Sequence, residues 1–352
     1  MHMADALLSP AVAATMYAAT AVTVGTSVKT LRNDENLAKL PTMAVTSALV
    51  FAGQMINYTI PGTGSSGHLC GGMMLTALLG PQAGFLSMVV ILSIQALFFA
   101  DGGLLALGAN CWNMAFYGCF VGYYLLWRPI MRSKLFGSSK GGARAKITLA
   151  SILGCVLTLQ LGAFSVVLET SASGITELPF GAFVGIMQPI HLAIGLVEGL
   201  ITSAVLVFVY EARPELLMDL NAQNVSGGKF SLKATIVILA VVTVLVGGAL
   251  SLGASGNPDG LEWSLFGNAE SGYSENMGLD EEHYGIASGA ADAAAAIQEK
   301  TAFLPDYAFA DSDSAVGTSV AGLVGSGIVA GVAVLVCMAG GFFRKKKVAA
   351  KA

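Results

Sequence analysis

The first two residues of the chain, Met1 and His2, carry donor atoms suited to a transition metal. The free α-amine, the amide nitrogen of residue 2 and the His2 imidazole can close two fused chelate rings around one ion. These three nitrogens lie roughly in a plane and leave a fourth corner open. A square-planar, all-nitrogen site favours Ni(II) or Cu(II). The alternative is a solvated terminus without a ligand role, and these residues alone favour that alternative.

His68 is a candidate for the fourth ligand. It is one of only four histidines in the chain and lies in the glycine-rich stretch 61–72, which we interpret as a flexible loop able to bring an imidazole to the open corner. Cys70 lies two residues further on. The five cysteines form no Cys-x-x-Cys pair, so we interpret the others as small apolar packing residues.

The composition predicts a membrane protein. Apolar residues make up 55% of the chain and charged residues 11%, and the mean hydropathy is +0.71, whereas a soluble protein of this length carries far more charge. Several apolar runs approach the ~20 residues that cross a bilayer as a helix. We therefore expect an all-α polytopic membrane protein. Because Lys29 is the first cation, the sequence shows no basic signal region, and we expect Met1 to remain the terminus.

Basic loops predict the orientation. The connections Lys29–Lys39 and Lys134–Lys146 and the terminal cluster Arg344–Lys347 are rich in cations, which places them in the cytoplasm. The amino terminus and His68 are then both expected outside, and the carboxy terminus inside. The predicted spans are 7–28, 42–60, 71–80, 82–100, 105–131, 147–168, 188–210, 231–254 and 317–343.

These spans divide the chain into two modules. Residues 1–212 form a seven-span unit, 213–230 a cytoplasmic linker, and 231–352 an accessory module with two spans around an outer segment, 255–316. That segment holds twelve Asp or Glu residues against a single lysine, Lys300. It is either a solvated acidic loop or a device that concentrates cations above the site. Because the candidate ligands lie within residues 1–68, the second module is expected to act only as an accessory.

Several motifs resemble a known family, the nickel/cobalt substrate-binding (S) component of energy-coupling-factor (ECF) transporters, also called the NikM/CbiM family. The resemblance covers about residues 1–212 and implies that the metal is held by the amine and amide nitrogens of Met1 and His2 and by both imidazoles, His2 and His68. The segment before His68 departs slightly from the family pattern. The motifs are Met1-His2 with Asp5, Leu8-Ser9-Pro10, Phe51–Asn57, Gly67-His68-Leu69 with Gly71-Gly72, Phe99–Leu104, Ala106–Asn110, Asn113–Ala115 and Pro189–Leu192.

The second module carries its own motif, Asn257–Trp263, which is similar to the small accessory NikN-type subunit of nickel transporters. The chain therefore resembles a fusion of two subunits (NikMN). The accessory subunit of the cobalt systems lacks this motif, so the resemblance favours Ni2+ as the substrate, with Co2+ as the alternative.

Other polar residues have less certain interpretations. Asp5, Gln54 and Asn57 could orient the ligands, because metal-bound histidines usually need such support, or they could be ordinary interfacial residues. His191 and Glu198 share one face of a predicted span and could form a buried pair or tie two helices together; we do not expect a second metal site there. His283, in the acidic segment, is interpreted as solvated.

The predicted function is a transport subunit rather than an enzyme. No Gly-x-x-x-x-Gly-Lys-Ser/Thr motif occurs, so ATP hydrolysis would fall to separate subunits; the resemblance implies two ATPases and a transmembrane coupling (T) subunit in a prokaryotic cell membrane. The lipid bilayer is the expected surrounding, and no nucleic-acid partner is expected. A metal sensor would need a signalling domain, and a metalloenzyme would need an open coordination position.

Overall fold

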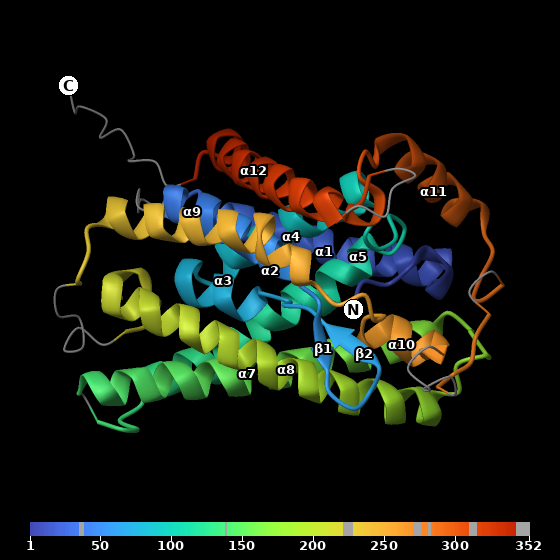
Figure 1. Ribbon diagram of the computed structural model, residues 1–352, viewed down its shortest axis with the longest axis horizontal. Coiled ribbons are helices and arrows are strands. Elements are labelled where there is room, and N and C mark those ends of the chain that lie inside the picture. Colours follow the sequence, from blue (N-terminus) through green and yellow to red (C-terminus); the bar gives the residue numbers. More distant parts are fainter. Residues whose placement is uncertain are drawn as a thin grey trace.

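The computed structural model describes residues 1–34, 39–137, 139–220, 228–269, 276–280, 283–309 and 315–342. Within these ranges the chain folds mainly into long helices that lie side by side (Figure 1). The first module contains α1 (Pro10–Leu31), α2 (Lys39–Gln54), α3 (Gly72–Leu79), α4 (Pro81–Phe99), α5 (Leu107–Asn110), the π-helical η2 (Cys111–Val121) and η3 (Tyr123–Trp127), α6 (Arg128–Arg132), α7 (Lys140–Ala172) and α8 (Phe180–Ala212).

The second module adds α9 (Leu232–Gly248), η6 (Leu250–Gly253), α10 (Gly260–Phe266), α11 (Gly289–Thr301), η8 (Pro305–Tyr307) and α12 (Ala315–Gly340). Short 3-10 turns, η1 (Asp5–Leu7) and η4 (Pro214–Leu216), precede α1 and follow α8. Among the described residues, six helical stretches are long and apolar enough to cross a membrane: Pro10–Leu31, Pro81–Phe99, Lys140–Ala172, Phe180–Ala212, Leu232–Gly253 and Val316–Gly340. The prediction of a helical, multi-pass membrane protein is confirmed, and the count of nine spans stays a prediction.

The helix α3 is shorter than the span predicted for residues 71–80. It has 8 residues, which at 1.5 Å per residue gives about 12 Å, less than half of the ~30 Å hydrocarbon core. Residues 68–71 before it are not helical. Non-helical backbone is tolerated at membrane depth only where protein surrounds it, and these four residues are largely buried.

A β-hairpin interrupts the helical pattern where the sequence predicted a flexible loop. Strands β1 (Tyr58–Ile60) and β2 (Ser65–Gly67) pair antiparallel, with Thr59 opposite Ser66. Gly62 and Gly64 in the connecting turn adopt φ values of 76° and 70°, a region that glycine enters at little cost. His68 therefore follows directly from a paired strand.

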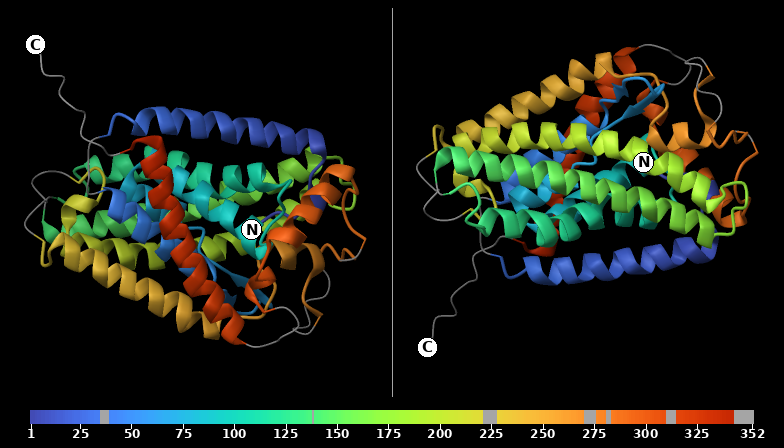
Figure 2. Two further views of the ribbon diagram at one scale, coloured as in Figure 1. Left: turned by 90° about the horizontal axis from the view of Figure 1, so that it is seen from above. Right: turned by 90° about the horizontal axis from the view of Figure 1, so that it is seen from below.

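The second module packs on the first through α2. Figure 2 shows α12 crossing the bundle obliquely, and the backbones of α9 and α12 meet where a Cβ on Gly322 would lie 2.1 Å from the Gly247 carbonyl oxygen. A Cβ on Gly325 would meet the ring of Phe51, in α2, at 2.2 Å. Small residues at these positions let the helices approach closely in lipid.

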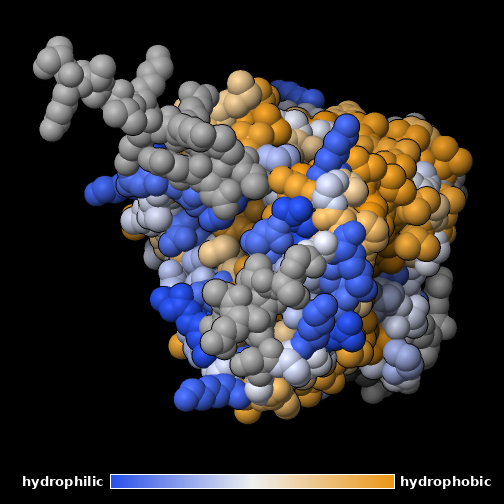
Figure 3. Space-filling model, turned by 90° about the vertical axis from the view of Figure 1, so that its left-hand side faces the viewer, coloured by the Kyte–Doolittle hydropathy of each residue, from blue (hydrophilic) through white to orange (hydrophobic). Residues whose placement is uncertain are grey.

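The two ends of the molecule differ. One end carries the α6–α7 connection and the end of α8, where Arg132 and Lys229 are exposed; Figure 3 shows hydrophilic side chains gathered on this end and hydrophobic ones along the adjoining flank. Met1 lies far from it, among the hairpin, α5 and α10 (Figure 1). The last residues described are at 342, so the predicted basic cluster Arg344–Lys347 lies outside the described residues.

Candidate metal centre

The amino-terminal segment is fixed inside the protein rather than solvated. The Met3 amide donates to Asn110 Oδ1 at 2.8 Å, the Asn110 amide donates back to the Met3 carbonyl at 3.2 Å, and Gly103 N donates to the same carbonyl at 2.8 Å. Met3 is 0% exposed and Met1 6%. The solvated terminus that the first residues alone favoured is therefore not what the structure contains.

The α-amine of Met1 and the ring of His68 are adjacent. The amine nitrogen lies 3.3 Å from His68 Nε2. His68 Nδ1 lies 3.0 Å from the Leu69 carbonyl oxygen, which can only accept, so the ring proton sits on Nδ1 and the Nε2 lone pair faces the amine. Two of the predicted ligand nitrogens are thus together and available.

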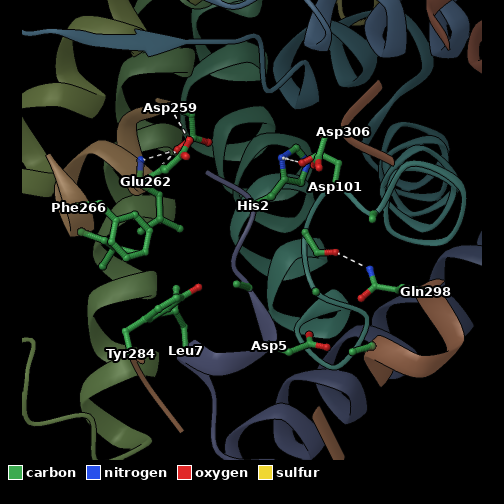
Figure 4. A pocket seen from close by; sticks show the side chains of 17 residues that line it. His2, Asp5, Leu7, Asp101, Asp259, Glu262, Phe266, Tyr284, Gln298 and Asp306 are labelled. Carbon is green, nitrogen blue, oxygen red and sulfur yellow. Dashed lines mark hydrogen bonds and ion pairs between the residues drawn. The ribbon is translucent and has the colours of Figure 1, made fainter. Parts of the chain in front are cut away.

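His2 completes the group. Its ring stacks on that of His68 with centroids 5.3 Å apart and an interplanar angle of 18°. His2 Nε2 lies 3.2 Å from Gln95 Oε1, and His2 Nδ1 lies 3.1 Å from Asp101 Oδ1; Figure 4 shows His2 and Asp101 facing each other across the cavity wall. Burial lowers the pKa of His2 to about 4, although the Asp101 charge acts in the opposite direction. The ring is therefore neutral near pH 7.

A chain of amides leads to His2. Gln54 Nε2 donates to the Cys70 carbonyl at 2.8 Å, and Gln95 Nε2 donates to Gln54 Oε1 at 3.0 Å. The Gln95 oxygen consequently faces His2 Nε2, while the Asp101 carboxylate faces Nδ1, so the neutral ring has an acceptor at each nitrogen and can donate to one of them. Nδ1 is the ring nitrogen that closes a six-membered chelate with the residue's own amide nitrogen.

The three residues predicted to support the ligands, Asp5, Gln54 and Asn57, lie near the candidate ligands but have no hydrogen bond to the His2 or His68 ring among the described contacts. Gln54 reaches His2 through Gln95, a residue that the sequence did not single out. Asp5 Oδ1 accepts from Ala106 N at 3.0 Å, and burial raises the pKa of Asp5, so this residue anchors the terminal segment. Asn57 lines the cavity beside His68, and its carbonyl accepts from Ser255 N at 2.7 Å.

An aspartate from the second module, Asp259, also reaches the group. Its Oδ2 lies 2.5 Å from the Met1 amine and 3.6 Å from His68 Nε2. Burial acts to raise the pKa of Asp259, but the amino terminus and His68 outweigh it and hold this pKa well below its usual range. The sequence placed Asp259 in a recognisable motif, yet nothing in its spacing pointed to Met1, 258 residues away. The second module, expected to act only as an accessory, thus contacts two of the candidate ligands, Met1 and His68.

Two cavities open beside the group. One, of about 650 Å³, is lined by His2, Asn57 and His68, and the other, of about 470 Å³, by His2 and Asp5. Both share the side chains of Asp101, Asp259, Glu262 and Asp306; several of these are labelled in Figure 4. Carboxylates along a cleft raise the local concentration of cations.

In the described ranges, the region around His2 and His68 included, no three His, Cys, Asp or Glu side chains gather as a metal cluster. A metal site built on His2 and His68 therefore depends on main-chain nitrogens. Cys70, two residues from His68, is buried and its thiol donates to the Met114 carbonyl at 3.1 Å. His283 is 75% exposed and bonds Asp280, in agreement with a solvated residue.

Glu198 and His191 have different partners from those expected. The Glu198 carboxylate accepts from the amides of Cys70 and Gly71, both at 2.9 Å. His191 Nδ1 lies 2.8 Å from the Met187 carbonyl and donates to it, while the buried Nε2 has no hydrogen-bond partner. Glu198 thus satisfies the non-helical backbone that carries His68 into the bundle.

The family model described as the cobalt uptake substrate-specific transmembrane region matches residues 2–216 of the chain. The chain belongs to this family. A second family model, the PDGLE domain, matches residues 233–340.

Similar proteins agree with that assignment. A putative fused nickel transport protein of Archaeoglobus fulgidus is 34% identical over 94% of this chain and 95% of its own. The fused nickel transport protein of Rhodobacter capsulatus is 32% identical over 70% and 72%, and a cobalt transport protein of Sorangium cellulosum is 30% identical over 56% and 84%. The crystal structure of a truncated transition metal transporter is 32% identical, with a TM-score of 0.51, over 60% of this chain and 99% of that one. This cobalt-uptake family member has the fold of a metal-transport membrane protein.

Proposed function

We propose that the protein is the high-affinity Ni2+ binding and uptake subunit of an ATP-driven ECF importer. In this proposal Ni2+ is the substrate, held by four nitrogens: the Met1 amine, the His2 amide, His2 Nδ1 and His68 Nε2. The observation that carries it is the buried Met1 amine 3.3 Å from the lone pair of His68 Nε2. This arrangement brings two nitrogen donors close enough to share one cation.

Nickel is proposed over cobalt on two grounds. A planar set of four nitrogens suits the electron count of Ni(II), and a relative that is similar over 94% of this chain is a fused nickel transport protein. Co2+ is the second candidate, because the family model and several relatives are named for cobalt. Competition between the two ions for the purified protein separates the candidates: bound Ni2+ should resist an excess of Co2+.

The proposal includes partners and an orientation. Two ATPases and a transmembrane coupling subunit would supply energy at the end with the exposed cations Arg132 and Lys229, which the positive-inside rule assigns to the cytoplasm. Met1, His68 and the acidic cavities would then face the outside, where the ion enters. Co-purification of the subunits with the full-length chain, and uptake that stops when ATP is withheld, test this part.

The terminus gives the sharpest test of the metal site. A single glycine added before Met1 moves the free amine away from its place beside His68 and adds bulk where Met1 is 6% exposed. We expect the extended protein to lose the high-affinity Ni2+ site that includes His68, whereas a tag at the carboxy terminus should leave it intact. If the extended protein keeps its affinity and that affinity still depends on His68, the Met1 nitrogens are not ligands.

A further inference from the structure

Asp259 is the point at which the second module touches the candidate ligands. Its Oδ2 lies 2.5 Å from the Met1 amine, although the two residues belong to different modules and to opposite ends of the sequence. The side chain is 20% exposed and borders both outer cavities. An ion pair in this position differs from a surface salt bridge, because one partner is a proposed metal ligand.

The position of Asp259 is built by the hairpin that precedes His68. Ser66 N donates to the Pro258 carbonyl at 2.8 Å, and Ser66 Oγ donates to the Asn257 carbonyl at 2.8 Å. On the other side, a Cβ on Gly260 would lie 2.9 Å from Ile194 Cδ1, so the start of α10 lies against α8. The residues flanking Asp259 are thus held by the same elements that hold His68.

The two oxygens of Asp259 have separate partners. Oδ1 accepts from the amides of Leu261 and Glu262 at 2.8 and 2.9 Å and so caps α10. Capping needs one oxygen only, and Asn does it as well as Asp. Oδ2 is left for Met1. The cap explains why a polar residue stands at this position, but it does not explain a second oxygen directed at the amine.

We propose that Asp259 is a positioning residue for the metal site, by which the second module orients the Met1 amine towards the cation. The inference rests on the proposed function. An amine bound to a metal keeps two N–H bonds, and one of them can donate to Oδ2 without moving the carboxylate. A carboxylate that accepts from a ligand's N–H fixes the direction of its lone pair and strengthens it as a donor, and loss of such a partner costs roughly 10–100-fold in metal affinity.

Asp259→Asn isolates this role. The substitution keeps the oxygen that caps α10 and replaces Oδ2 with an NH2 group, which cannot accept from the amine. We expect a roughly 10–100-fold weaker Ni2+ affinity by calorimetry and a shift of the Ni(II) absorption band to lower energy, because the amine becomes a weaker donor. The matched control is Asp292→Asn, the same change at an exposed residue of α11, which should leave both unchanged.

Asp259→Ser is the second variant. Serine also caps helices but places no group near the amine. This variant should therefore weaken Ni2+ binding without introducing the NH2 donor that Asn brings. The inference is overturned if folded Asp259→Asn and Asp259→Ser bind Ni2+ as the unaltered protein does, or if affinity falls while the band does not move, since a purely structural defect would leave the bound metal unchanged. If instead the unaltered protein binds no Ni2+, the proposed function fails, and this inference with it.

Discussion

At the scale of single residues, the candidate site depends on which nitrogen of each imidazole carries the proton. His68 Nδ1–H is held by the Leu69 carbonyl, so Nε2 presents its lone pair to the Met1 amine. His2 has an acceptor at each ring nitrogen, Gln95 Oε1 at Nε2 and Asp101 Oδ1 at Nδ1. Metal binding through His2 Nδ1 requires the proton to be on Nε2, where Gln95 can accept it.

Replacing His68 tests its role directly. In His68→Ala one of four proposed nitrogen ligands is lost, and bound Ni2+ should fall to near background while the protein still inserts and folds. The matched control is His283→Ala, because His283 is a solvated histidine whose loss should leave stoichiometry unchanged. Metal analysis of the two purified variants decides; equal nickel content in both would remove His68 from the site.

The buried His2 predicts a pH dependence of stability. Burial lowers the pKa of His2 from its usual 6.5 to about 4 in the folded protein. Because the folded pKa is depressed, this contribution to stability is complete above pH 6.5 and is lost as pH falls towards 4, by up to about 3 kcal/mol. The melting temperature of the metal-free protein should drop across this window, and His2→Gln should show a flatter profile. Parallel profiles for the two proteins would contradict the prediction.

The residue types of the proposed ligands could be predicted from the sequence because chelation by an amine, an amide and an imidazole is local chemistry. Their supporting residues could not. Gln95, Asp101 and Asp259 reach the group through tertiary contacts of 93, 99 and 258 positions, and nothing in the neighbouring sequence records such a contact. Asn57 and Gln54 were placed near the site by motif, without their partners.

At the scale of elements, the sequence located most helices because apolar runs of about 20 residues are a strong signal. It missed the β1–β2 hairpin, because six strand residues that include Ser65, Ser66 and Gly67 carry no alternating apolar pattern. The short α3, predicted at 71–80, begins and ends within one residue of those bounds. The Glu198 carboxylate pairs with the backbone between the hairpin and α3.

Removing that carboxylate should loosen the segment that carries His68. Glu198→Leu leaves the buried amides of Cys70 and Gly71 without an acceptor, at a cost of about 1–3 kcal/mol for each. Glu198→Gln keeps one acceptor and should fall between Leu and the unaltered protein. Thermal unfolding in detergent and Ni2+ affinity are the measurements.

The control for this series is Glu211→Gln on the same helix. Glu211 pairs with Arg144 and Lys229 at the end of the molecule far from Met1, and surface ion pairs contribute little to stability. If Glu198→Leu and Glu211→Gln behave alike, the two amides have another acceptor and the assigned role of Glu198 is wrong.

At the scale of the whole molecule, two of the contacts between the modules bear on the site. The first is the crossing of α12 over α9 and α2, and the second is the contact of residues 257–259 with the hairpin and Met1. If Asp259 positions the amine, the crossing helices determine how well it can do so, because they anchor the module to which it belongs.

Two glycines on α12, one in a close helix contact and one in open space, allow the effect of helix packing to be measured against the effect of the substitution itself. In Gly322→Val the new side chain would overlap the Gly247 backbone, with Cβ 2.1 Å from its oxygen, whereas a Cβ on Gly327 meets nothing within 4 Å. We expect Gly322→Val to lower the melting temperature and to weaken Ni2+ binding towards the level of Asp259→Asn. Gly327→Val should match the unaltered protein in both assays, and a similar loss in both variants would show that the crossing is not what anchors the module.

The described parts of the connection between the modules, residues 213–220 and 228–230, lie at the end of the molecule far from Met1 (Figure 1). There Lys229 N donates to the Glu211 carbonyl and Phe230 N to the Ala212 carbonyl, so the chain returns to the end of α8 before α9 begins. The described parts of this connection lie away from the candidate ligands, and the connection acts as a tether between the two modules. Tethering gives one module an effective concentration on the order of millimolar around the other, so a contact with a dissociation constant of roughly 10 µM would be formed about 99% of the time. Closure of the site by both modules is then a property of a single molecule, independent of how many copies the membrane holds.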